Sequence, residues 1–163
     1  MRTATEQKMI LSGLQMKNKL QELLDAKSQK HFATTSGTDM HKRLEHVFFH
    51  SDGPVGDKEL CDKISKNSEL VKLMGPLSKT EVPIAGFVNG IFVSRRIDRL
   101  YIDKDNKQIV VLDYKTDTSK DVFRDKYIIQ LKEYRDLLTQ VFPGFTISCK
   151  ILWLCDFTLE NII

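Results

Sequence analysis

Two aspartates and one lysine of this sequence could together form a metal-dependent hydrolytic site. Asp113 and Lys115 directly follow the apolar block Ile109-Val110-Val111-Leu112 in "QIVVLDYK". Such a block predicts a buried strand, and residues two apart on a strand project from the same face. The sequence therefore places a carboxylate and an ammonium group together where a core strand ends.

A second carboxylate, Asp98, is expected to face Asp113. The segment 95–117 reads as two strands joined around Asp105-Asn106, because both residue types tolerate the left-handed backbone angles of a two-residue hairpin loop. That loop pairs 102 with 109 and 98 with 113. A four-residue loop over 104–107 gives the same pairing, whereas a three-residue loop would shift it. Directly opposed residues have Cβ atoms about 4.5–5.5 Å apart.

Two facing carboxylates repel each other, and the pKa of at least one of them rises unless a cation neutralises the pair. A divalent cation with oxygen ligands, Mg²⁺ or Mn²⁺, is the natural neutraliser. Lys115 would then lie beside the water that the ion activates. The spacing alone leaves a plainer alternative open, which is a surface hairpin that ends in an Asp–Lys ion pair.

Helices are predicted on either side of a strand-rich centre. Residues 5–30 read as a surface helix with a polar face rich in Lys, Gln and Glu. A second helix follows the capping residues 36–38 and has apolar residues at helical spacing up to Phe48. Residues 57–75 read as helical, and a further helix is predicted over 122–141.

Strand character fills the region 79–114 in three runs, and the apolar run "FTISCKILWLC" predicts a last strand. The order of helices, three strands, helix and strand predicts an α/β or α+β fold with a central mixed sheet. With 163 residues, the chain suits one domain. We expect a helical extension over 1–35 and a core domain over 36–163.

The composition restricts the class of protein but not its partner. The chain is 41% hydrophobic and 29% charged, as an ordinary globular protein is. Its net charge of +3 does not by itself argue for nucleic acid. The three cysteines fit no disulfide framework, so a cytoplasmic location is expected. The sequence has neither a run of about 18 apolar residues nor a signal-peptide core, so no membrane association is expected.

Five short motifs follow one another in the sequence. They are Gly37-Thr38-Asp39-Met40-His41, Glu81 in "TEVPIAG", Asp98 in "RIDRL", Asp113-Tyr114-Lys115, and Gln130 to Tyr134 in "QLKEY". In this order they resemble the nuclease domain of the RecB/AddA type, in the PD-(D/E)XK superfamily. The resemblance implies a restriction-endonuclease-like core of helix, three strands, helix and strand, with extra N-terminal helices. The sequence departs from the family pattern at Arg95, where the family usually has Gly.

The resemblance also implies how the site binds metal. Asp98 and Asp113 would share one Mg²⁺ or Mn²⁺ with the backbone carbonyl of Tyr114, and His41 would be a further ligand. Lys115 would orient or deprotonate the attacking water and stabilise the charge that develops on the phosphate. The plainer interpretation of His41 is a capping or core histidine.

Three further side chains would complete the site. Glu81 would join the acidic cluster or hold a second metal, although a strand Glu is more often merely solvated. Gln130 and Tyr134, at i and i+4 on one helix face, would contact the DNA strand or brace the active site. A local basic rim would attract phosphates, and its residues are Arg95, Arg96, Arg99, Lys120, Arg124 and Lys126.

A zinc site is a weak alternative. His46 and His50 have the i, i+4 spacing of a helical zinc pair, but no cysteine or third ligand has a suitable spacing.

By resemblance, the protein is expected to be a metal-dependent DNA nuclease, an exonuclease on DNA ends or single strands in recombinational double-strand break repair. The sequence contains no G-x-x-x-x-G-K-[ST] phosphate loop, so a helicase would be a separate subunit or domain. The alternative is a catalytically inactive module of the same fold that binds DNA or a repair partner. A structural scaffold without DNA affinity is the third possibility.

Overall fold

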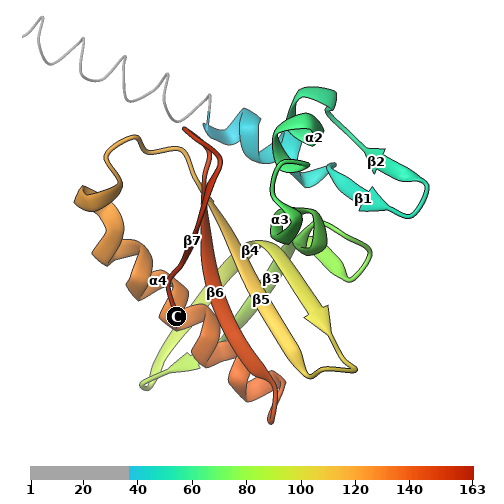
Figure 1. The fold of residues 1–163 in the computed structure, drawn as a ribbon. Coiled ribbons are helices and arrows are strands. Elements are labelled where there is room, and N and C mark those ends of the chain that lie inside the picture. The colour runs from blue at the N-terminus through green and yellow to red at the C-terminus, as the bar shows by residue number, and fades with distance from the viewer. Residues whose placement is uncertain (1–36) are drawn as a thin grey trace, which may run out of the picture. The chain divides into compact units, whose positions relative to one another are not determined.

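The computed structural model describes residues 37–163, and Asp39–Ile163 form one compact unit. The predicted helix over 5–30 and the N-terminal extension 1–35 lie outside the described residues. The unit is an α+β fold built on a five-stranded mixed sheet (Figure 1). No helix within the described part of the chain is long and apolar enough to cross a membrane.

The sheet has the strand order β3-β4-β5-β6-β7. These strands are Ser78–Val88, Ile91–Asp103, Gln108–Lys115, Thr146–Trp153 and Thr158–Asn161. Only β5 and β6 run parallel, and every other neighbouring pair is antiparallel. The three predicted strands and the predicted last strand are confirmed. The short β7 was not predicted.

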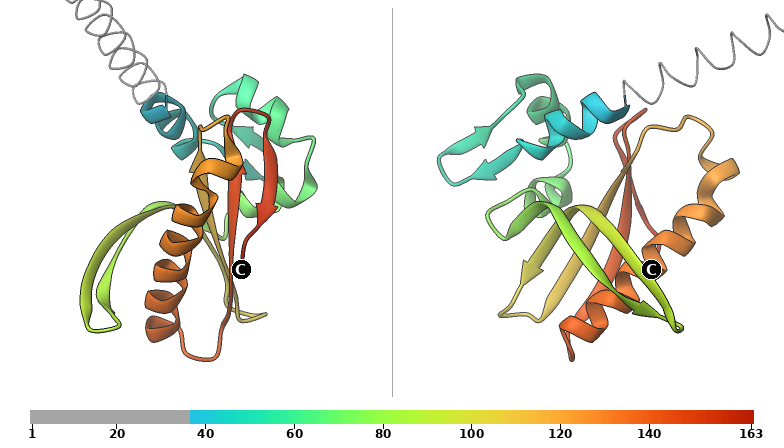
Figure 2. Two further views of the ribbon diagram at one scale, coloured as in Figure 1. Left: turned by 90° about the vertical axis from the view of Figure 1, so that its left-hand side faces the viewer. Right: turned by 180° about the vertical axis from the view of Figure 1, so that it is seen from behind.

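Helix α4 (Lys120–Val141) connects β5 to β6 and covers one face of the sheet (Figure 2). It is the helix predicted over 122–141. A connection of this length is what two parallel neighbours require. Leu131, Tyr134 and Leu138 of α4 are buried against strand residues such as Val111 and Ile151. Because β5 and β6 are parallel, their C-terminal ends lie at the same end of the sheet, and α4 begins shortly after β5 ends.

The other face of the sheet is covered by the helical residues 39–45, by α2 (Lys58–Ile64) and by α3 (Ser68–Leu73). The single helix predicted over 57–75 is two helices. Asn67 separates them, because its side-chain oxygen accepts hydrogen bonds from the N–H groups of Glu69 and Leu70 and so begins a new helix.

The helix predicted up to Phe48 ends at residue 45, which corrects the prediction. The next residues form β1 (Phe48–His50), paired with β2 (Gly53–Val55). The physical reason is local, since aromatic residues favour strands and Gly53 has a φ of 129° at the turn. The helical periodicity of this stretch is also compatible with a short strand packed on the same core.

The predicted register of β4 and β5 is confirmed where the two strands pair. Ile102 lies opposite Ile109, and Arg99 lies opposite Leu112. The connection is the four-residue loop 104–107 rather than two residues, since Asp103 pairs with Gln108. The ladder ends at Arg99 and Leu112, one residue before Asp98 and Asp113, so the predicted pairing of these two aspartates stays a prediction.

The pair β3–β4 exchanges its two faces at Glu81 and Asp98. Between this point and the β4–β5 loop, Arg99 and Tyr101 contact the core on the face of the sheet that α2 and α3 cover. Beyond it, Ile97 and its partner Val82 pack on the α4 face. Regular alternation would put Ile97, Arg99 and Tyr101 on one face of the strand. Ile97 is on the other face, so the two-stranded ribbon twists over between Ile97 and Arg99.

The backbone at Glu81 makes this change possible, with a φ of 53°. The part of β3 and β4 beyond this point is called here the distal hairpin (residues 82–97). Its two strands pair with each other and with no other strand of the described residues. It curves past α4 (Figure 2), where Arg95 forms an ion pair with Glu133. Its turn is Asn89-Gly90, and both residues have positive φ, as a type I′ turn requires.

Candidate active site

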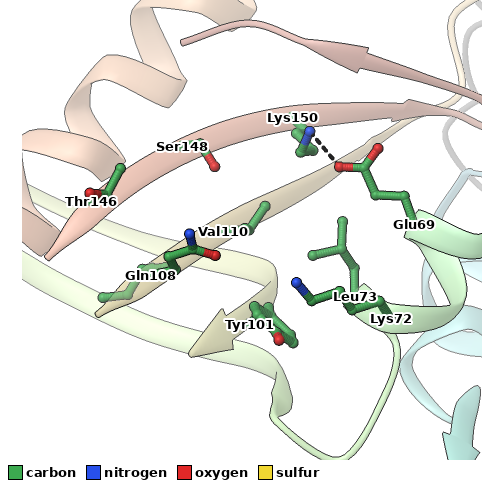
Figure 3. A pocket seen from close by; sticks show the side chains of 10 residues that line it. Glu69, Lys72, Leu73, Tyr101, Gln108, Val110, Thr146, Ser148 and Lys150 are labelled. Carbon is green, nitrogen blue, oxygen red and sulfur yellow. Dashed lines mark ion pairs between the residues drawn. The ribbon is translucent and has the colours of Figure 1, made fainter. Parts of the chain in front are cut away.

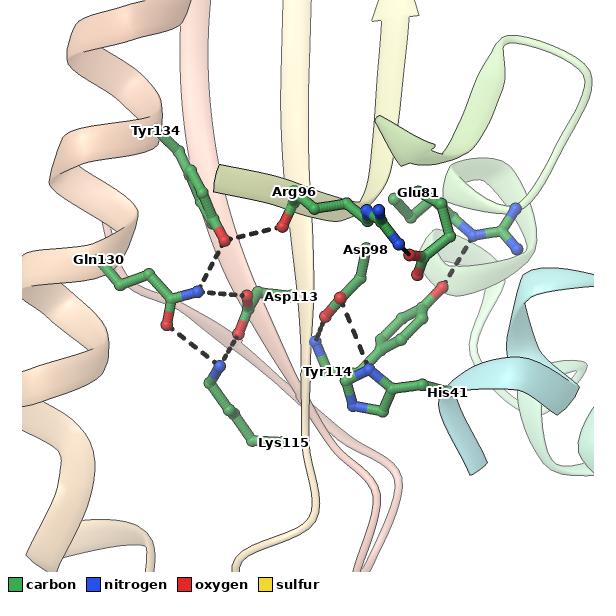
Figure 4. A network of polar contacts seen from close by, with 10 residues as sticks. His41, Glu81, Arg96, Asp98, Asp113, Tyr114, Lys115, Gln130 and Tyr134 are labelled. Carbon is green, nitrogen blue, oxygen red and sulfur yellow. Dashed lines mark hydrogen bonds and ion pairs between the residues drawn. The ribbon is translucent and has the colours of Figure 1, made fainter. Parts of the chain in front are cut away.

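The polar network at the C-terminal end of β5 is centred on Asp113 (Figure 4). Its carboxylate is almost fully buried, with 3% of the side chain exposed. The pKa of Asp113 is raised to about 6, because burial and the charge of Asp98 raise it by more than Lys115 and His41 lower it. A carboxylate in this position is costly to ionise unless cations surround it.

Asp98 lies on the neighbouring strand and fills the gap where β4 turns away from β5. Its Oδ2 accepts a hydrogen bond of 2.7 Å from the backbone N–H of Tyr114. The N–H and C=O of one strand residue point toward the same neighbouring strand, so the Tyr114 carbonyl is also directed toward Asp98. The two carboxylates and this carbonyl are the oxygen atoms that, by the resemblance, would share a metal ion.

His41 approaches Asp98 from the helical residues 39–45. Its Nδ1 lies 3.5 Å from Asp98 Oδ1, and its ring meets the ring of Tyr114 edge to face. Burial alone would lower the pKa of His41, but the contact with Asp98 and the charges of Asp98 and Asp113 raise it overall. The predicted association of His41 with the acidic pair is therefore present in the geometry.

Lys115 lies on the same face of β5 as Asp113, as the alternation of strand side chains predicted. Its Nζ is 2.6 Å from Asp113 Oδ2 and donates a hydrogen bond of 3.2 Å to Gln130 Oε1. Among the described residues, Asp113 Oδ2 has no partner with regular hydrogen-bond geometry. We regard its contact with Lys115 as a short charge contact, which leaves the lone pairs of this oxygen incompletely used.

Gln130 and Tyr134 brace the site from α4. The Gln130 side-chain amide donates to Asp113 Oδ1 at 3.4 Å and to the Tyr134 hydroxyl at 2.7 Å. Tyr134 in turn donates to the backbone carbonyl of Arg96, at 2.9 Å. Gln130 therefore touches both Asp113 and Lys115, while Tyr134 ties α4 to the strand that carries Asp98.

Glu81 lies on β3, next to the strand that carries Asp98 and on the far side of that strand from Asp113. Its Oε2 pairs with Arg96 at 3.3 Å, and Figure 4 shows it beyond Asp98 as seen from Asp113. A non-glycine residue with positive φ costs on the order of 1 kcal/mol or more, and such residues are concentrated at functional sites. The three acids thus occupy three neighbouring strands, with Asp98 in the middle.

The prediction that Arg99 contacts DNA is wrong for the position that it occupies. Arg99 is 0% exposed. Its guanidinium donates to the carbonyls of Leu44 and Val47, the hydroxyl of Ser78 and the hydroxyl of Tyr114. It follows Asp98 in sequence but points to the opposite face, where it fastens the segment that carries His41 to the strands.

The other predicted rim residues are at the surface but carry carboxylate partners. Arg95 pairs with Glu133, Arg96 with Glu81, Lys120 with Asp156 and Arg124 with Glu160. Lys126 is exposed and forms no ion pair with any residue between 37 and 163. The basic rim therefore exists as a set of groups whose charge is largely balanced within the protein.

The side chains alone make an incomplete metal cage. Among residues 37–163, no group of three or more His, Cys, Asp and Glu side chains is arranged to hold a metal ion. The weak zinc alternative loses its basis, since His50 lies on β1 and not on a helix with His46. Two carboxylates with a backbone carbonyl remain, which is a hard-oxygen donor set.

A pocket on the opposite face of the sheet has different chemistry (Figure 3). It is lined by strand residues such as Gln108 and Ser148 and by the side chains of Lys72 and Lys150. Lys150 is bonded to Glu69 and Asn161, and Lys72 lies over the Tyr101 ring. The lysines of this pocket are thus already engaged, and the pocket holds no cluster of acids.

Sequence reasoning missed one neighbour of the site, Tyr127 of α4. Its ring lies beside Lys115, and its hydroxyl donates to Asp117. The available signal was its spacing, because Tyr127 precedes Gln130 by three residues and therefore shares its helix face.

No protein-family model matches this sequence, and a comparison with curated proteins also finds no match.

Proposed function

We propose that this protein is a metal-dependent DNA nuclease with a restriction-endonuclease-like core, of the RecB/AddA type in the PD-(D/E)XK superfamily. The observation that supports the proposal is the contact of Asp113 with Lys115 at the end of β5, beside Asp98 of β4, which accepts a hydrogen bond from the N–H of Tyr114. These residues come from two strands and are braced by Gln130 from α4. A buried, ionisable carboxylate with an under-used oxygen is costly to the fold, so it calls for an explanation.

The donor set suits Mg²⁺ or Mn²⁺ better than a metal ion that needs all of its ligands from protein side chains. Mg²⁺ keeps several waters and commonly binds through one or two carboxylates together with substrate phosphates. Asp98, Asp113 and the Tyr114 carbonyl would hold the ion, with His41 at the side of Asp98 as a further ligand. Among residues 37–163 no three such side chains are arranged as a metal cage, so the two carboxylates would bind the ion first and His41 would join them only as an additional ligand.

When bound, the ion would polarise the scissile phosphodiester and lower the pKa of a bound water. Lys115 holds its amine beside Asp113, where it can orient that water and balance negative charge on the phosphate oxygens. Gln130 holds the Lys115 and Asp113 side chains in place, because its amide oxygen accepts from Lys115 and its amide nitrogen donates to Asp113. Glu81, with Arg96, lies at the outer side of Asp98 and would contact the substrate backbone or a second ion.

The proposed substrate is DNA, as ends or single strands, in recombinational double-strand break repair. A helicase subunit or domain would deliver the strand, and exonucleolytic cleavage is the proposed mode. The cytoplasm is the proposed location, because the three cysteines fit no disulfide framework. The substrate, the helicase and the mode of cleavage are supported by the motif resemblance alone.

The test is digestion of end-labelled single-stranded DNA with Mg²⁺ or Mn²⁺, compared with EDTA and with Lys115→Ala. We expect metal-dependent degradation that falls at least about 100-fold in the variant, since a positioned proton-transfer group contributes about 10²–10⁴-fold. Lys104→Ala, on the exposed β4–β5 loop, is the matched control and should retain activity. Degradation that is metal-independent, or equal in Lys115→Ala, contradicts the proposal.

A second candidate is an inactive module of the same fold that binds DNA or a repair partner. The observation in its favour is that Lys115 already neutralises Asp113, so the pair can exist without a metal. Binding of labelled DNA without cleavage, at any concentration of Mg²⁺ or Mn²⁺, would favour this candidate over the nuclease.

A further inference from the structure

The Lys115 ammonium lies over the face of an aromatic ring. Its Nζ is 4.4 Å from the centroid of the Tyr127 ring, well inside the roughly 6 Å within which a cation is attracted to the ring face. Lys115 is only 15% exposed, so the contact is largely shielded from water. Shielding strengthens this kind of attraction, because the ammonium has less water to lose.

Among the described residues, the Lys115 ammonium contacts Asp113, Gln130 and the Tyr127 ring. The contacts with Asp113 and Gln130 would change when Asp113 binds a metal ion. Asp113 Oδ2 is 2.6 Å away, but a carboxylate that binds a divalent cation has less charge to offer an amine. Gln130 Oε1, at 3.2 Å, belongs to an amide that also bonds Asp113. The Tyr127 ring depends on neither, and its attraction for the ammonium is unchanged when Asp113 is engaged elsewhere.

The Tyr127 ring is itself held on several sides. Its hydroxyl donates a short hydrogen bond to Asp117, in the segment between β5 and α4. The ring packs at a tilt against Phe123 and Trp153, with centroids 6.3 Å and 6.1 Å away. Trp153 is buried and donates its indole N–H to Glu160. A ring fixed in this way presents a preformed face to the amine.

We propose that Tyr127 is a positioning residue whose ring keeps the Lys115 ammonium at the active site when Asp113 binds a cation. The part of this inference that concerns catalysis rests on the proposed nuclease function. The alternative is that Tyr127 merely fills space between α4 and β6. The two differ in what they require, since positioning needs the aromatic face but filling needs only apolar volume.

The first test measures the amine directly and needs no nuclease activity. The folded protein is treated with an acylating reagent, and the rate of modification of Lys115 is followed by mass spectrometry in the wild type, Tyr127→Phe and Tyr127→Leu. The phenylalanine keeps the ring and should protect Lys115 as well as tyrosine does. The leucine removes the ring, and we expect Lys115 to be modified several times faster.

Phe142→Leu is the matched control, because it removes a ring at the opposite end of α4, where Phe142 packs against Phe145. Its Lys115 should be modified at the wild-type rate. Thermal melting of each variant establishes that the compared proteins are folded. Equal modification rates in Tyr127→Leu and the wild type would overturn the inference.

The second test uses the nuclease assay at saturating Mn²⁺. Tyr127→Leu should lower kcat about 10-fold with little change in KM, because the amine acts on the reacting groups and not on the rest of the strand. Tyr127→Phe should restore most of kcat. A loss of activity that is the same in Tyr127→Phe and Tyr127→Leu would assign the effect to the Asp117 bond and overturn a role for the ring.

The two proposals fail in distinguishable ways. A wild-type protein without nuclease activity contradicts the proposed function, while the modification rates still decide whether Tyr127 holds the amine. An active nuclease whose Lys115 is equally reactive in Tyr127→Leu and the wild type contradicts the inference alone.

Discussion

At the scale of single residues, the ionisation of Asp113 controls the site. Its pKa in the folded protein is about 6, against an ordinary value of 3.8, because the carboxyl group is buried and faces Asp98. The folded state therefore holds the proton of Asp113 more tightly than the unfolded chain does. It follows that Asp113 contributes stability at low pH that is lost as the pH rises through about 6.

The first prediction follows from this sign. In the metal-free protein, the stability of the wild type relative to Asp113→Asn should fall as the pH rises from about 4 to about 6, and then level off. Denaturant unfolding across this pH range measures the difference. Lys115, Asp98 and His41 also face this carboxyl group. The slope of relative stability against pH therefore reflects the ionisation of the whole cluster and not of Asp113 alone. A relative stability that rises with pH would contradict the assignment.

Metal binding should show the opposite dependence on pH, which is the second prediction. A protonated carboxyl group is a poor ligand, so the rise in Tm on addition of Mn²⁺ should be small below about pH 6 and larger above it. His41, whose pKa is raised, acts in the same direction because it is a ligand only when neutral. Differential scanning fluorimetry measures the shift, and Asp113→Asn should lose most of it.

At the scale of secondary-structure elements, β4 delivers neighbouring residues to opposite faces of the sheet. Asp98 reaches the site, while Arg99 enters the core and binds the carbonyls of Leu44 and Val47. These carbonyls lie at the end of the helical segment that carries His41. Arg99 therefore sets the distance between His41 and the aspartates without touching either.

The third prediction is that Arg99→Met destabilises the protein strongly. The substitution leaves buried acceptors at Ser78, Tyr114 and two carbonyls without their donor. Each unsatisfied buried group costs about 1–3 kcal/mol, so we expect a loss of at least ~3 kcal/mol in the free energy of unfolding. Urea denaturation measures the loss. Arg96→Met is the control, since an exposed ion pair contributes at most about 1 kcal/mol.

The fourth prediction concerns the break between α2 and α3. Asn67 caps α3 through two backbone N–H groups, and Asn67→Ala should lower the free energy of unfolding by about 1 kcal/mol. The exposed neighbour Lys66 offers a control, and Lys66→Ala should be close to neutral. Equal effects of the two substitutions in urea denaturation would show that the cap is unimportant.

The elements that the sequence predicted well are those with long, regular patterns. The strands around Asp98 and Asp113 were found together with their register, because the apolar run and the loop length restrict the pairing. The misplaced elements depend on local competition, as at Phe48, where a helical pattern gives way to a hairpin. The inward face of Arg99 follows from its pairing with Leu112, whereas the face of Ile97 could not be predicted, because the alternation rule fails between Ile97 and Arg99.

At the scale of the whole molecule, the charge is nearly balanced. The net charge is +3, and the basic residues around the site are mostly paired with carboxylates. Phosphate contacts would have to compete with these pairs. Affinity for DNA should therefore be modest and should depend strongly on salt.

The fifth prediction tests this competition. Arg96→Gln should weaken the binding of labelled single-stranded DNA in EDTA and reduce the salt slope of log K by about 0.7, the value for one phosphate contact on a single strand. Fluorescence anisotropy over a series of KCl concentrations measures it. Lys104→Gln changes the net charge equally but lies on the β4–β5 loop, so its slope should match that of the wild type.

The turn-over of the ribbon at Glu81 and Asp98 also separates two parts of the chain that selection could alter independently. The distal hairpin beyond it pairs with no strand outside itself and ends in a two-residue turn at Asn89-Gly90. Residues inserted or deleted in pairs at that turn would lengthen or shorten the reach of the hairpin while the alternation of its faces stayed the same. The carboxylates would keep their spacing, so a lineage could change what the hairpin touches without rebuilding the chemistry at its base.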